Sequence, residues 1–469
     1  MCFRTVLIVL LSTTPFIACE SGSSSSGGEN TEEETGDAAD EETGDTADEE
    51  TGDTAGEETG DITGEETGEE TGDITGEETG EEIVCPEPDG LRPMRRSEHA
   101  GIYDPVGHRV IINGGSTGVP VNCGFPTPTF EVDTWIYDIA CNHWKQIASP
   151  VGRGRHMATY DSTEHRMLTF GGRFRAGDSG PYILYNDLYA LDLETETWEK
   201  LVVTTNVGVG APAPRMNAVF IYDPTGHRAI LFGGNTEGNV MAGYKPQNDT
   251  WVLDLTTMAW TQLDPDNPPA PRLFSAALWD VNRDRMVLTG GADESAFSNF
   301  ATYFDDMWAL DFSGEQPTWT ALEQGAFVPA GRFWAGMVHD AKADRYVMFG
   351  GHDATNLGNT NDTQSYDPEA GAWTPLSMGD TWNKPANGFC DFPPDFTNVD
   401  MTSPERRNAH VMVAGTDKAW IVHGKTDCGV VDDLVEIDFG TTEWTTLSPA
   451  TVGVSCIRKG GVNCNDLCF

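Results

Sequence analysis

The chain has 469 residues and carries 75 Asp and Glu against 28 Lys and Arg, which gives a net charge of −47. More than half of this excess negative charge lies in residues 20–84, where no Lys or Arg occurs. Because affinity for nucleic acid comes mainly from Lys and Arg contacts to phosphates, we expect no nucleic-acid partner. Nearly all aromatic residues lie in 85–469, a length that suits one large all-β domain or two ordinary domains.

Residues 1–18, MCFRTVLIVLLSTTPFIA, combine one Arg with an apolar run and end in a small residue before Cys19. This pattern predicts a secretory signal peptide, too short and too interrupted to span a membrane. FIAC (16–19) resembles the lipobox of bacterial lipoproteins, although Phe16 replaces the usual Leu. We expect secretion across the inner membrane and a lipid anchor at Cys19 in the bacterial outer membrane, on its periplasmic or cell-surface side. Ordinary cleavage near this position is the alternative.

Residues 19–84 form a low-complexity segment in which Thr-Gly alternates with Glu and Asp, as in EETGDAAD, EETGDTAD and EETGDTAG. Almost no large apolar side chain is present to offset the entropy cost of ordering, and the like charges favour an extended chain. We predict a disordered acidic linker that acts as a spacer. Weak calcium binding is the alternative, but the segment lacks the spaced ligands of an EF-hand loop.

One motif then recurs along the chain: an Asp, an apolar-x-Asp a few residues later, and a Trp that follows this second Asp. The six copies are DTWIYDIACNHW (133–144), DLYALDLETETW (187–198), DTWVLDLTTMAW (249–260), DMWALDFSGEQPTW (306–319), DTQSYDPEAGAW (362–373) and DLVEIDFGTTEW (433–444).

A second motif lies upstream of each copy, where an Arg precedes a glycine at a fixed distance. In five copies the glycine begins a Gly-Gly pair, and the arginines are Arg96, Arg153, Arg215, Arg272 and Arg332. In the sixth copy we assign this position to Arg406, which precedes only the single glycine of VHGK.

A fixed period with four short β-like segments per unit is typical of a β-propeller. In the third unit these segments are 218–222, 229–232, 250–254 and 259–263. The glycines permit positive φ and close backbone approach after the second strand. We expect the first Asp to bind backbone amides in the turn before the third strand, and the Trp of the fourth strand to fill the gap between neighbouring blades.

The order Arg, Gly-Gly, Asp and Trp resembles kelch repeats in the form found in the central domain of galactose oxidase and in bacterial secreted proteins. The resemblance implies an all-β fold, a six-bladed kelch-type propeller over 85–469 with a short Cys-rich C-terminal tail. The expected repeats are approximately 95–148, 149–203, 211–264, 268–323, 328–377 and 403–448.

The histidines give no clear catalytic or metal site. His108, His165 and His227 lie in the expected turn between the first two strands, and His99, His156 and His410 begin first strands, which are structural places in a kelch repeat. His352 and His423 remain a possible metal pair, but two imidazoles without a third ligand make a weak site. The copper site of galactose oxidase also needs a C-terminal domain without counterpart here. We therefore predict no catalytic residue, cofactor or metal site.

Two functions remain open. We favour an envelope-tethered binding module, a monomeric propeller that recognises a protein or glycan and contacts the membrane only through its lipid anchor. The alternative is a carbohydrate-active isomerase similar to the sialic acid mutarotase, which is also a six-bladed kelch protein. Acid–base catalysis of that kind would require Arg, Glu and His to converge from several loops. The sequence does not decide whether the chain is an enzyme.

Eight cysteines follow Cys19, an even number that favours disulfides in a secreted chain. They are Cys85, Cys123, Cys141, Cys390, Cys428, Cys456, Cys464 and Cys468. We predict a bond between Cys390 and Cys428, which fall in loops of one propeller face. A bond from Cys85 to one of the last three cysteines would close the ring covalently.

The loops that join the second to the third strand, and one blade to the next, vary in length, whereas the other turns keep one length. Variable loops on a rigid scaffold are where binding residues usually lie. We therefore predict a binding face on the variable loops, whose candidate residues are Phe125, Phe130, Tyr182, Tyr244, Phe300, Tyr303, His352, Trp382, Phe389, Phe392 and Phe396.

Overall fold

The computed structural model describes residues 84–118, 129–177, 179–205, 210–239, 242–298, 300–353, 358–383, 397–427 and 429–452. The described residues all belong to the second of two units along the chain, Gly80–Phe469. The predicted signal peptide and linker fall outside the described residues, as do Cys123, Cys390, Cys428, Cys456, Cys464 and Cys468. Within the described part of the chain, no helix is long and apolar enough to cross a membrane.

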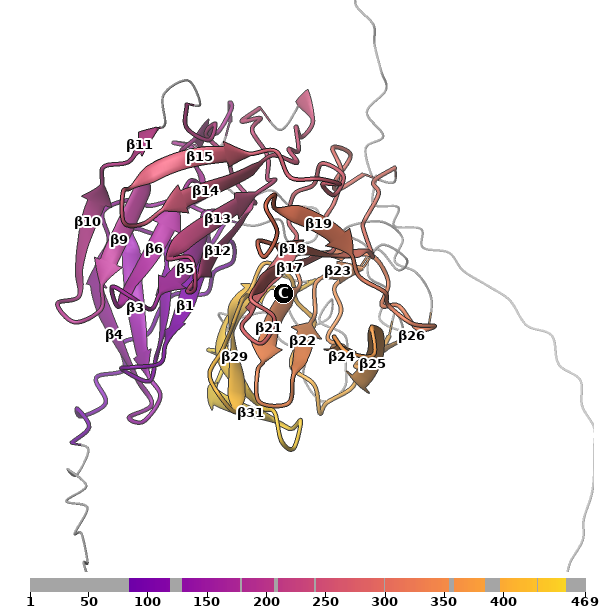
Figure 1. The fold of residues 1–469 in the computed structure, drawn as a ribbon. Coiled ribbons are helices and arrows are strands. Elements are labelled where there is room, and N and C mark those ends of the chain that lie inside the picture. The colour runs from indigo at the N-terminus through magenta and orange to yellow at the C-terminus, as the bar shows by residue number, and fades with distance from the viewer. Residues whose placement is uncertain are drawn as a thin grey trace, which may run out of the picture. The chain divides into compact units, whose positions relative to one another are not determined.

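The fold of the second unit is the predicted all-β, six-bladed propeller (Figure 1). The first blade comprises β1 (Ala100–Asp104), β2 (Arg109–Asn113), β3 (Asp133–Asp138) and β4 (His143–Ala148). The second comprises β5 (Met157–Asp161), β6 (Arg166–Phe170), β9 (Leu188–Asp192) and β10 (Thr197–Leu201). The third comprises β12 (Val219–Asp223), β13 (Arg228–Phe232), β14 (Thr250–Asp254) and β15 (Ala259–Leu263), with β11 (Thr204–Thr205) parallel to β15 at its edge.

The remaining three blades repeat this order. The fourth comprises β16 (Ala276–Asp280), β17 (Arg285–Thr289), β18 (Met307–Asp311) and β19 (Thr318–Ala321). The fifth comprises β21 (Gly336–Asp340), β22 (Arg345–Phe349), β24 (Thr363–Asp367) and β25 (Ala372–Ser377). The sixth comprises β28 (Val411–Ala414), β29 (Lys418–Lys425), β30 (Val430–Asp438) and β31 (Trp444–Ser448). Two-stranded ribbons in the loops pair β7 (Arg173–Phe174) with β8 (Ile183–Leu184), β20 (Arg332–Phe333) with β23 (His352–Asp353) and β26 (Thr381–Trp382) with β27 (Thr397–Asn398).

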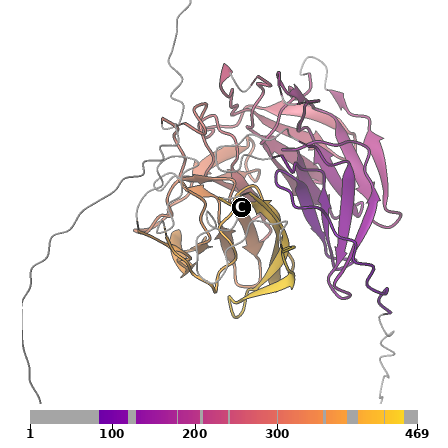
Figure 2. The same ribbon diagram turned by 180° about the vertical axis from the view of Figure 1, so that it is seen from behind.

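Within each blade consecutive strands are antiparallel, so the blade has two ends of different kinds. We call the end with the two short turns, between first and second and between third and fourth strands, the turn side. The other end, with the variable loops and the connections between blades, is the loop side. The first strands β1, β5, β12, β16, β21 and β28 each contact the next around the axis, and β28 contacts β1. The ring therefore closes although no strand is shared between the first and the last blade. Figure 2 shows the blades from behind.

The recurring tryptophans fill the spaces between blades, as predicted. Trp260 of the third blade is fully buried with its ring 5.4 Å from that of Phe170 in the second. Trp319 of the fourth blade lies 4.8 Å from Phe232 of the third. Burial of such aromatic surface is the largest favourable contribution that one residue per blade can make.

The recurring arginines hold the loop side of each blade through the first Asp of the motif. Arg215 donates from both terminal nitrogens to the carboxylate of Asp249, at 2.6 and 2.8 Å, and from Nη1 to the carbonyl of Gly233 at 2.8 Å. The expectation that this Asp binds turn amides was wrong. The second Asp does so instead: Asp254 accepts from the amides of Thr256 and Thr257.

The same arginines also link the blades. The carbonyl of each one accepts the amide of the second glycine of the preceding blade's Gly-Gly pair, or of the single Gly424 in the last blade. These bonds, at 2.8 to 3.0 Å, run Gly115 to Arg153, Gly172 to Arg215, Gly234 to Arg272, Gly291 to Arg332, Gly351 to Arg407 and Gly424 to Arg96. The last of them crosses the seam between the chain's two ends, so the hydrogen-bonded circle is complete.

The sixth-blade arginine is Arg407, not Arg406 as predicted. Arg407 donates to both oxygens of Asp433 and to the carbonyl of His423, and its own carbonyl accepts from Gly351. Two adjacent arginines made the assignment ambiguous, and only one can occupy the repeating position. Arg406 is a separate buried side chain that pairs with Asp380 at 2.6 Å and Asp427 at 2.9 Å.

Cys85 forms a disulfide with Cys141, with a Cα–Cα distance of 5.3 Å. The expected bond from Cys85 to the C-terminal tail was therefore wrong. Cys141 lies in the turn between β3 and β4, so the chain before the first blade is fastened to the turn side. It then runs to the loop side, where Arg92 donates to the carbonyl of Asp432 and Arg96 donates its amide to Val431, both in the sixth blade. Residues 85–96 thus form a strap across the seam.

Candidate functional site

The predicted binding residues lie at different depths on the loop side. Phe130, Tyr303 and His352 are buried, with 6 to 8% of their surface exposed, whereas Phe300 is 89% exposed. Tyr182, Tyr244 and Trp382 are partly buried. Phe125, Phe389, Phe392 and Phe396 fall outside the described residues. The prediction of a contact surface made of all these residues remains untested.

The loop side has an inner collar that sequence reasoning missed. Its members are the residues two positions after each recurring arginine, all with positive φ: Glu98, Arg155, Asn217, Phe274, Trp334 and Ala409. The collar residues bond to one another from blade to blade, as when Arg155 donates its amide to the carbonyl of Glu98 at 2.7 Å. The fixed spacing from the arginine was the signal in the sequence that could have found them.

Aromatic rings gather over one half of this collar. Phe274 and Trp334 have ring centroids 4.1 Å apart, and Phe333 lies 5.4 Å from Phe274 and 5.0 Å from Tyr303. Phe297, on the loop of the fourth blade, is 5.1 Å from Phe333 and 38% exposed. These rings fix the loops above them and leave the edge of Phe297 in contact with solvent.

The other half of the collar contains a buried ion group. Glu98 pairs with Arg155 at 2.8 Å and with Arg173 at 2.9 Å, and all three side chains are at least nine-tenths buried. Burial opposes the charged carboxylate, but the two arginines outweigh it and lower the pKa of Glu98 to about 2. Arg173 stacks on Tyr182 at 3.9 Å and Arg155 on Trp334 at 4.8 Å. A carboxylate of so low a pKa is a poor proton donor or acceptor near neutral pH.

Exposed large apolar side chains are unevenly distributed over the described residues. On the loop side they are Val132, Ile183, Val202, Phe297, Phe300, Phe327, Val328, Met378, Met401 and Val452. On the turn side they are Val106, Val281 and, beside the Cys85–Cys141 disulfide, Val84, while Leu91 and Met94 lie on the strap. Apolar surface that gathers on one face is typical of an interaction surface.

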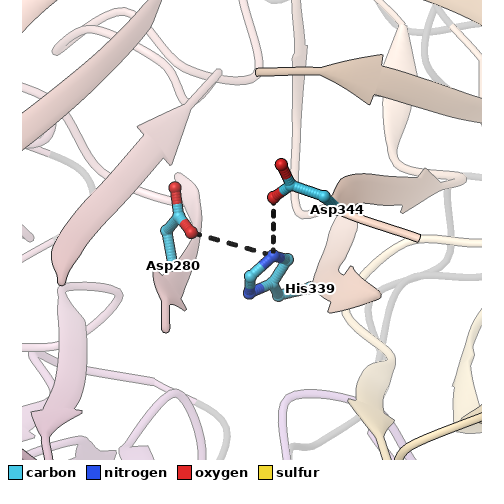
Figure 3. A group of neighbouring side chains, drawn as sticks. All are labelled: Asp280, His339 and Asp344. Carbon is cyan, nitrogen blue, oxygen red and sulfur yellow. Dashed lines mark ion pairs between the residues drawn. The ribbon is translucent and has the colours of Figure 1, made fainter. Parts of the chain in front are cut away.

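On the turn side, Asp280, His339 and Asp344 are the group of possible metal ligands found among the described residues (Figure 3). Nε2 of His339 lies 3.7 Å from Asp280 and 3.9 Å from Asp344. The donor set fits a metal ion poorly. Val281 donates its amide to Nδ1 of His339, which leaves the ring proton on Nε2, and Arg283 already pairs with Asp344 at 2.7 Å.

The same place in other blades contains related contacts with a structural role. His165 of the second blade lies 2.9 Å from Asp104 of the first, and His227 of the third lies 3.8 Å from Asp161 of the second. Each contact joins a turn of one blade to the first strand of the blade before it. His339 lies on the first strand β21 rather than in a turn, but its contact with Asp280 likewise joins the fifth blade to the fourth.

The proposed pair of His352 and His423 has no shared ligand set. His352 contacts Asn359 and lies 5.0 Å from Phe333, whereas His423 is fully buried beside His99, at 5.5 Å, and Trp144. Burial lowers the pKa of His352 to about 3 and that of His423 well below 6.5. Both are neutral rings that pack.

The geometry agrees with a family match. The family described as the KLHDC2/KLHL20/DRC7 Kelch-repeats domain matches residues 105–342 and 185–390. The chain belongs to the kelch-repeat family. Kelch propellers generally bind protein partners, and membership supports a protein-interaction module as the coarse function.

Similar proteins extend over parts of this kelch chain. Adagio protein 3 of Arabidopsis thaliana is 28% identical over 259 residues, which cover 52% of this chain and 37% of that protein. Multiple epidermal growth factor-like domains protein 8 of Mus musculus is 28% identical over 174 residues, 36% of this chain and 6% of the relative. Kelch domain-containing protein 10 of Xenopus tropicalis is 22% identical over 308 residues, 64% of this chain and 66% of its own. The chain thus spans a minor part of the first two relatives.

A solved structure gives the same architecture. The structure of YjhT superposes with a TM-score of 0.53 at 16% identity, and covers 78% of this chain and 99% of the other. At that identity the likeness shows the fold alone. The kelch propeller therefore supplies the scaffold, and its function has to be argued from the residues on its two sides.

Proposed function

We propose that this chain is a tethered kelch module that binds a protein partner on its loop side. One observation carries the proposal: among the described residues, exposed large apolar side chains gather on the loop side and are few on the turn side. Phe297, Phe300 and Ile183 come from two different loops and are 38 to 89% exposed. Exposed apolar groups spread over several loops suit a broad partner surface better than a small ligand.

The test compares matched substitutions on the two sides. Ile183→Asp, on the loop side, and Val281→Asp, on the turn side, replace side chains that are 57% and 55% exposed. A partner captured by the full-length chain, and identified by mass spectrometry, should bind the first variant at least tenfold more weakly. The second variant should bind normally. Equal loss in both variants, or loss only in the second, would reverse the assignment of the face.

The proposed partner class is also tested by ligand identity. A purified protein that binds with one-to-one stoichiometry supports the proposal. If the full-length chain captures a glycan through the loop side instead, the face is right and the partner class is wrong.

The tether is part of the proposal. We infer that residues 1–18 direct secretion, that Cys19 is lipidated, and that the acidic segment 19–84 spaces the propeller from the outer membrane of a bacterium. Motif composition at 16–19 and the run of Glu and Asp support this. Cys19→Ser should release the protein from the membrane fraction. A wild-type protein that is already soluble in the periplasm or medium would refute the anchor.

The isomerase alternative has one feature in its favour, because Glu98, Arg155 and Arg173 do converge from neighbouring blades. The lowered pKa of Glu98 argues against proton transfer by this carboxylate near neutral pH. Anomer exchange of free sialic acid, followed by NMR, tests the alternative directly. A rate above the uncatalysed one that Glu98→Gln abolishes would establish it.

A further inference from the structure

A cavity of about 630 Å³ opens on the turn side along the propeller axis. Its wall is built in layers, with one residue from each blade in each layer. The rim consists of the residues that follow the ends of the first strands: Pro105, Ser162, Pro224, Val281, Ala341 and Gly415. The layer below it consists of Tyr103, Tyr160, Tyr222, Trp279, His339 and Val413. We call this cavity the axial cup.

Small residues make the cup deep. Gly101, Ala158 and Ala277 line its inner part, beneath the ring-bearing layer. The side chains in the layer between them are apolar or hydroxylic, with Ile102, Thr159 and Met412 among them. The cup therefore has the size and the mainly apolar wall of a small-molecule site, and ring side chains surround its entrance.

The lining of the cup is almost free of charge. Although the chain has 75 acidic residues, none of those that the structure describes lines the cup. Lys342 is the lining residue with a full positive charge, and it pairs with Asp417 at 2.6 Å. The carboxylates just behind the wall are also neutralised, as Asp104 is by Arg109 and Asp340 by Arg345. A charged ligand would find no unpaired opposite charge, and its desolvation would be uncompensated.

The wall offers polar edges in addition to ring faces. Tyr103, Tyr160, Ser162 and Thr416 carry hydroxyl groups at or near the rim. A ligand with flat C–H faces and hydroxyl edges would match both features, because aromatic rings pack on apolar faces while hydroxyl groups need polar partners.

We propose that the axial cup is a binding site for an uncharged saccharide of one or two rings. The site lies on the side of the propeller opposite the proposed protein-binding face and does not depend on that function. Ring side chains in the layer below the rim stack on the sugar, and the wall's hydroxyl groups hydrogen-bond to its hydroxyl groups. An acidic or amino sugar is disfavoured, because the wall has no unpaired charge to receive it.

The probes are maltose, cellobiose and lactose as neutral sugars, with glucuronate and glucosamine as charged comparators. Saturation-transfer NMR with the full-length chain should show transfer to at least one neutral sugar and none to the charged ones. Tryptophan fluorescence should change on the same titration because Trp279 lines the cup. Absence of transfer to all three neutral sugars would overturn the proposal, and so would equal transfer to the charged pair.

Two pairs of variants place the binding in the cup. Ser162→Trp and Ala341→Trp put a bulky ring on the exposed rim, and both should abolish the signal. Their controls are Glu164→Trp and Ala343→Trp, which lie in the same two turns, are exposed, and do not line the cup. The controls should bind as wild type does. If one rim variant fails to fold, the pair in the other turn still tests the proposal. A rim variant is compared with its control only if both melt at the same temperature as the wild type.

A third variant tests a hydroxyl contact. Tyr160→Phe keeps a ring in the wall and removes the hydroxyl, so affinity should fall about tenfold, as for the loss of one hydrogen bond in a desolvated site. Ile183→Asp on the loop side should leave sugar binding unchanged. If the rim variants bind the neutral sugar as well as wild type does, the sugar lies elsewhere and the proposal is wrong.

Discussion

Different arginines stabilise the two ends of each blade. The loop-side arginines link neighbouring blades around the ring, whereas the turn-side arginines bind mainly within their own hairpin. On the loop side, Arg215 and its equivalents are nearly fully buried, and their carbonyls accept hydrogen bonds from the preceding blade. On the turn side, Arg166 and its equivalents bind an Asp five residues earlier in the same hairpin and stay partly exposed. The loop-side pair occurs in all six blades. The turn-side pair is absent from the sixth, where Ala414 faces Ala419.

A closed ring of blades requires contacts between every pair of neighbours, including the last blade and the first. A ring without a shared strand must join its last blade to its first by the same contacts that join every other pair. Those contacts run through the loop-side arginines and glycines. The turn-side pairs fix their own hairpins and add single contacts to the next blade, as when Arg109 also donates to the carbonyl of Leu193, and the sixth blade lacks such a pair.

Acid should have the largest effect, and it should act on the loop side first. His99, His156 and His423 lie at that end, and burial lowers the pKa of His156 to about 3 and those of the other two well below 6.5. Below pH 6.5 the unfolded chain takes up protons that the folded chain refuses, so stability falls as the pH drops from about 6.5 toward 3. At pH 5 the loss is on the order of 2 kcal/mol for each histidine.

Thermal melting between pH 8 and pH 4 measures this loss. Replacing His156 with Gln should flatten the decline in melting temperature below pH 6.5 relative to the wild type. Identical pH profiles for the variant and the wild type would contradict the assignment of acid sensitivity to this loop-side histidine.

The next largest effect should come from breaking one loop-side pair. Arg215→Met leaves the Asp249 carboxylate without its main partner and should lower the free energy of unfolding by about 3–5 kcal/mol. Chemical denaturation measures it. The double variant Arg215→Met, Asp249→Leu removes both charges and should recover part of the loss. A double variant less stable than the single one would show that the arginine acts mainly through its backbone contacts.

Removal of the strap's disulfide should have an intermediate effect. Cys85→Ser with Cys141→Ser opens a cross-link that spans 56 residues and should cost about 2–4 kcal/mol. Reduction of the wild-type protein by dithiothreitol should give at least this loss, because it also opens the predicted Cys390–Cys428 bond. A double-serine variant that melts with the oxidised wild type would mean that Arg92 and Arg96 suffice to hold the strap.

The smallest effect should come from the turn side. Arg166→Met removes one partner of Asp161, which still accepts from the amides of Thr163 and Glu164. We expect a loss of about 1–2 kcal/mol, because the carboxylate stays hydrogen-bonded. Chemical denaturation beside Arg215→Met tests the ranking. A larger loss for Arg166→Met than for Arg215→Met would invalidate the comparison of the two ends.

Much of the fold was predictable, because the same arrangement of residues recurs in every repeat. Six copies of one spacing predicted the blades and the inter-blade tryptophans such as Trp260. Arg407 could not be told from Arg406, since the choice depends on which backbone carbonyl meets Gly351. The pairing of Cys85 with Cys141 depends on the path of the strap, which no local pattern encodes.

The candidate sites were less predictable than the fold. Loop aromatics look alike in a sequence, whether they end buried, as Tyr303 does, or 89% exposed, as Phe300 does. Burial there is decided by neighbouring loops. The axial cup was missed because its lining comes one residue at a time from all six blades, so no stretch of the chain resembles a site.

The circle of glycine and arginine hydrogen bonds makes the position of the chain ends arbitrary. The amide of Gly424 donates to the carbonyl of Arg96 just as the amide of Gly172 donates to that of Arg215. The chain ends can therefore lie at any junction between two blades. A circular permutant that joins the end of β31 to the strap and begins at the third blade would keep every one of these bonds. Gene rearrangement could therefore rotate the order of the blades without altering the folded molecule.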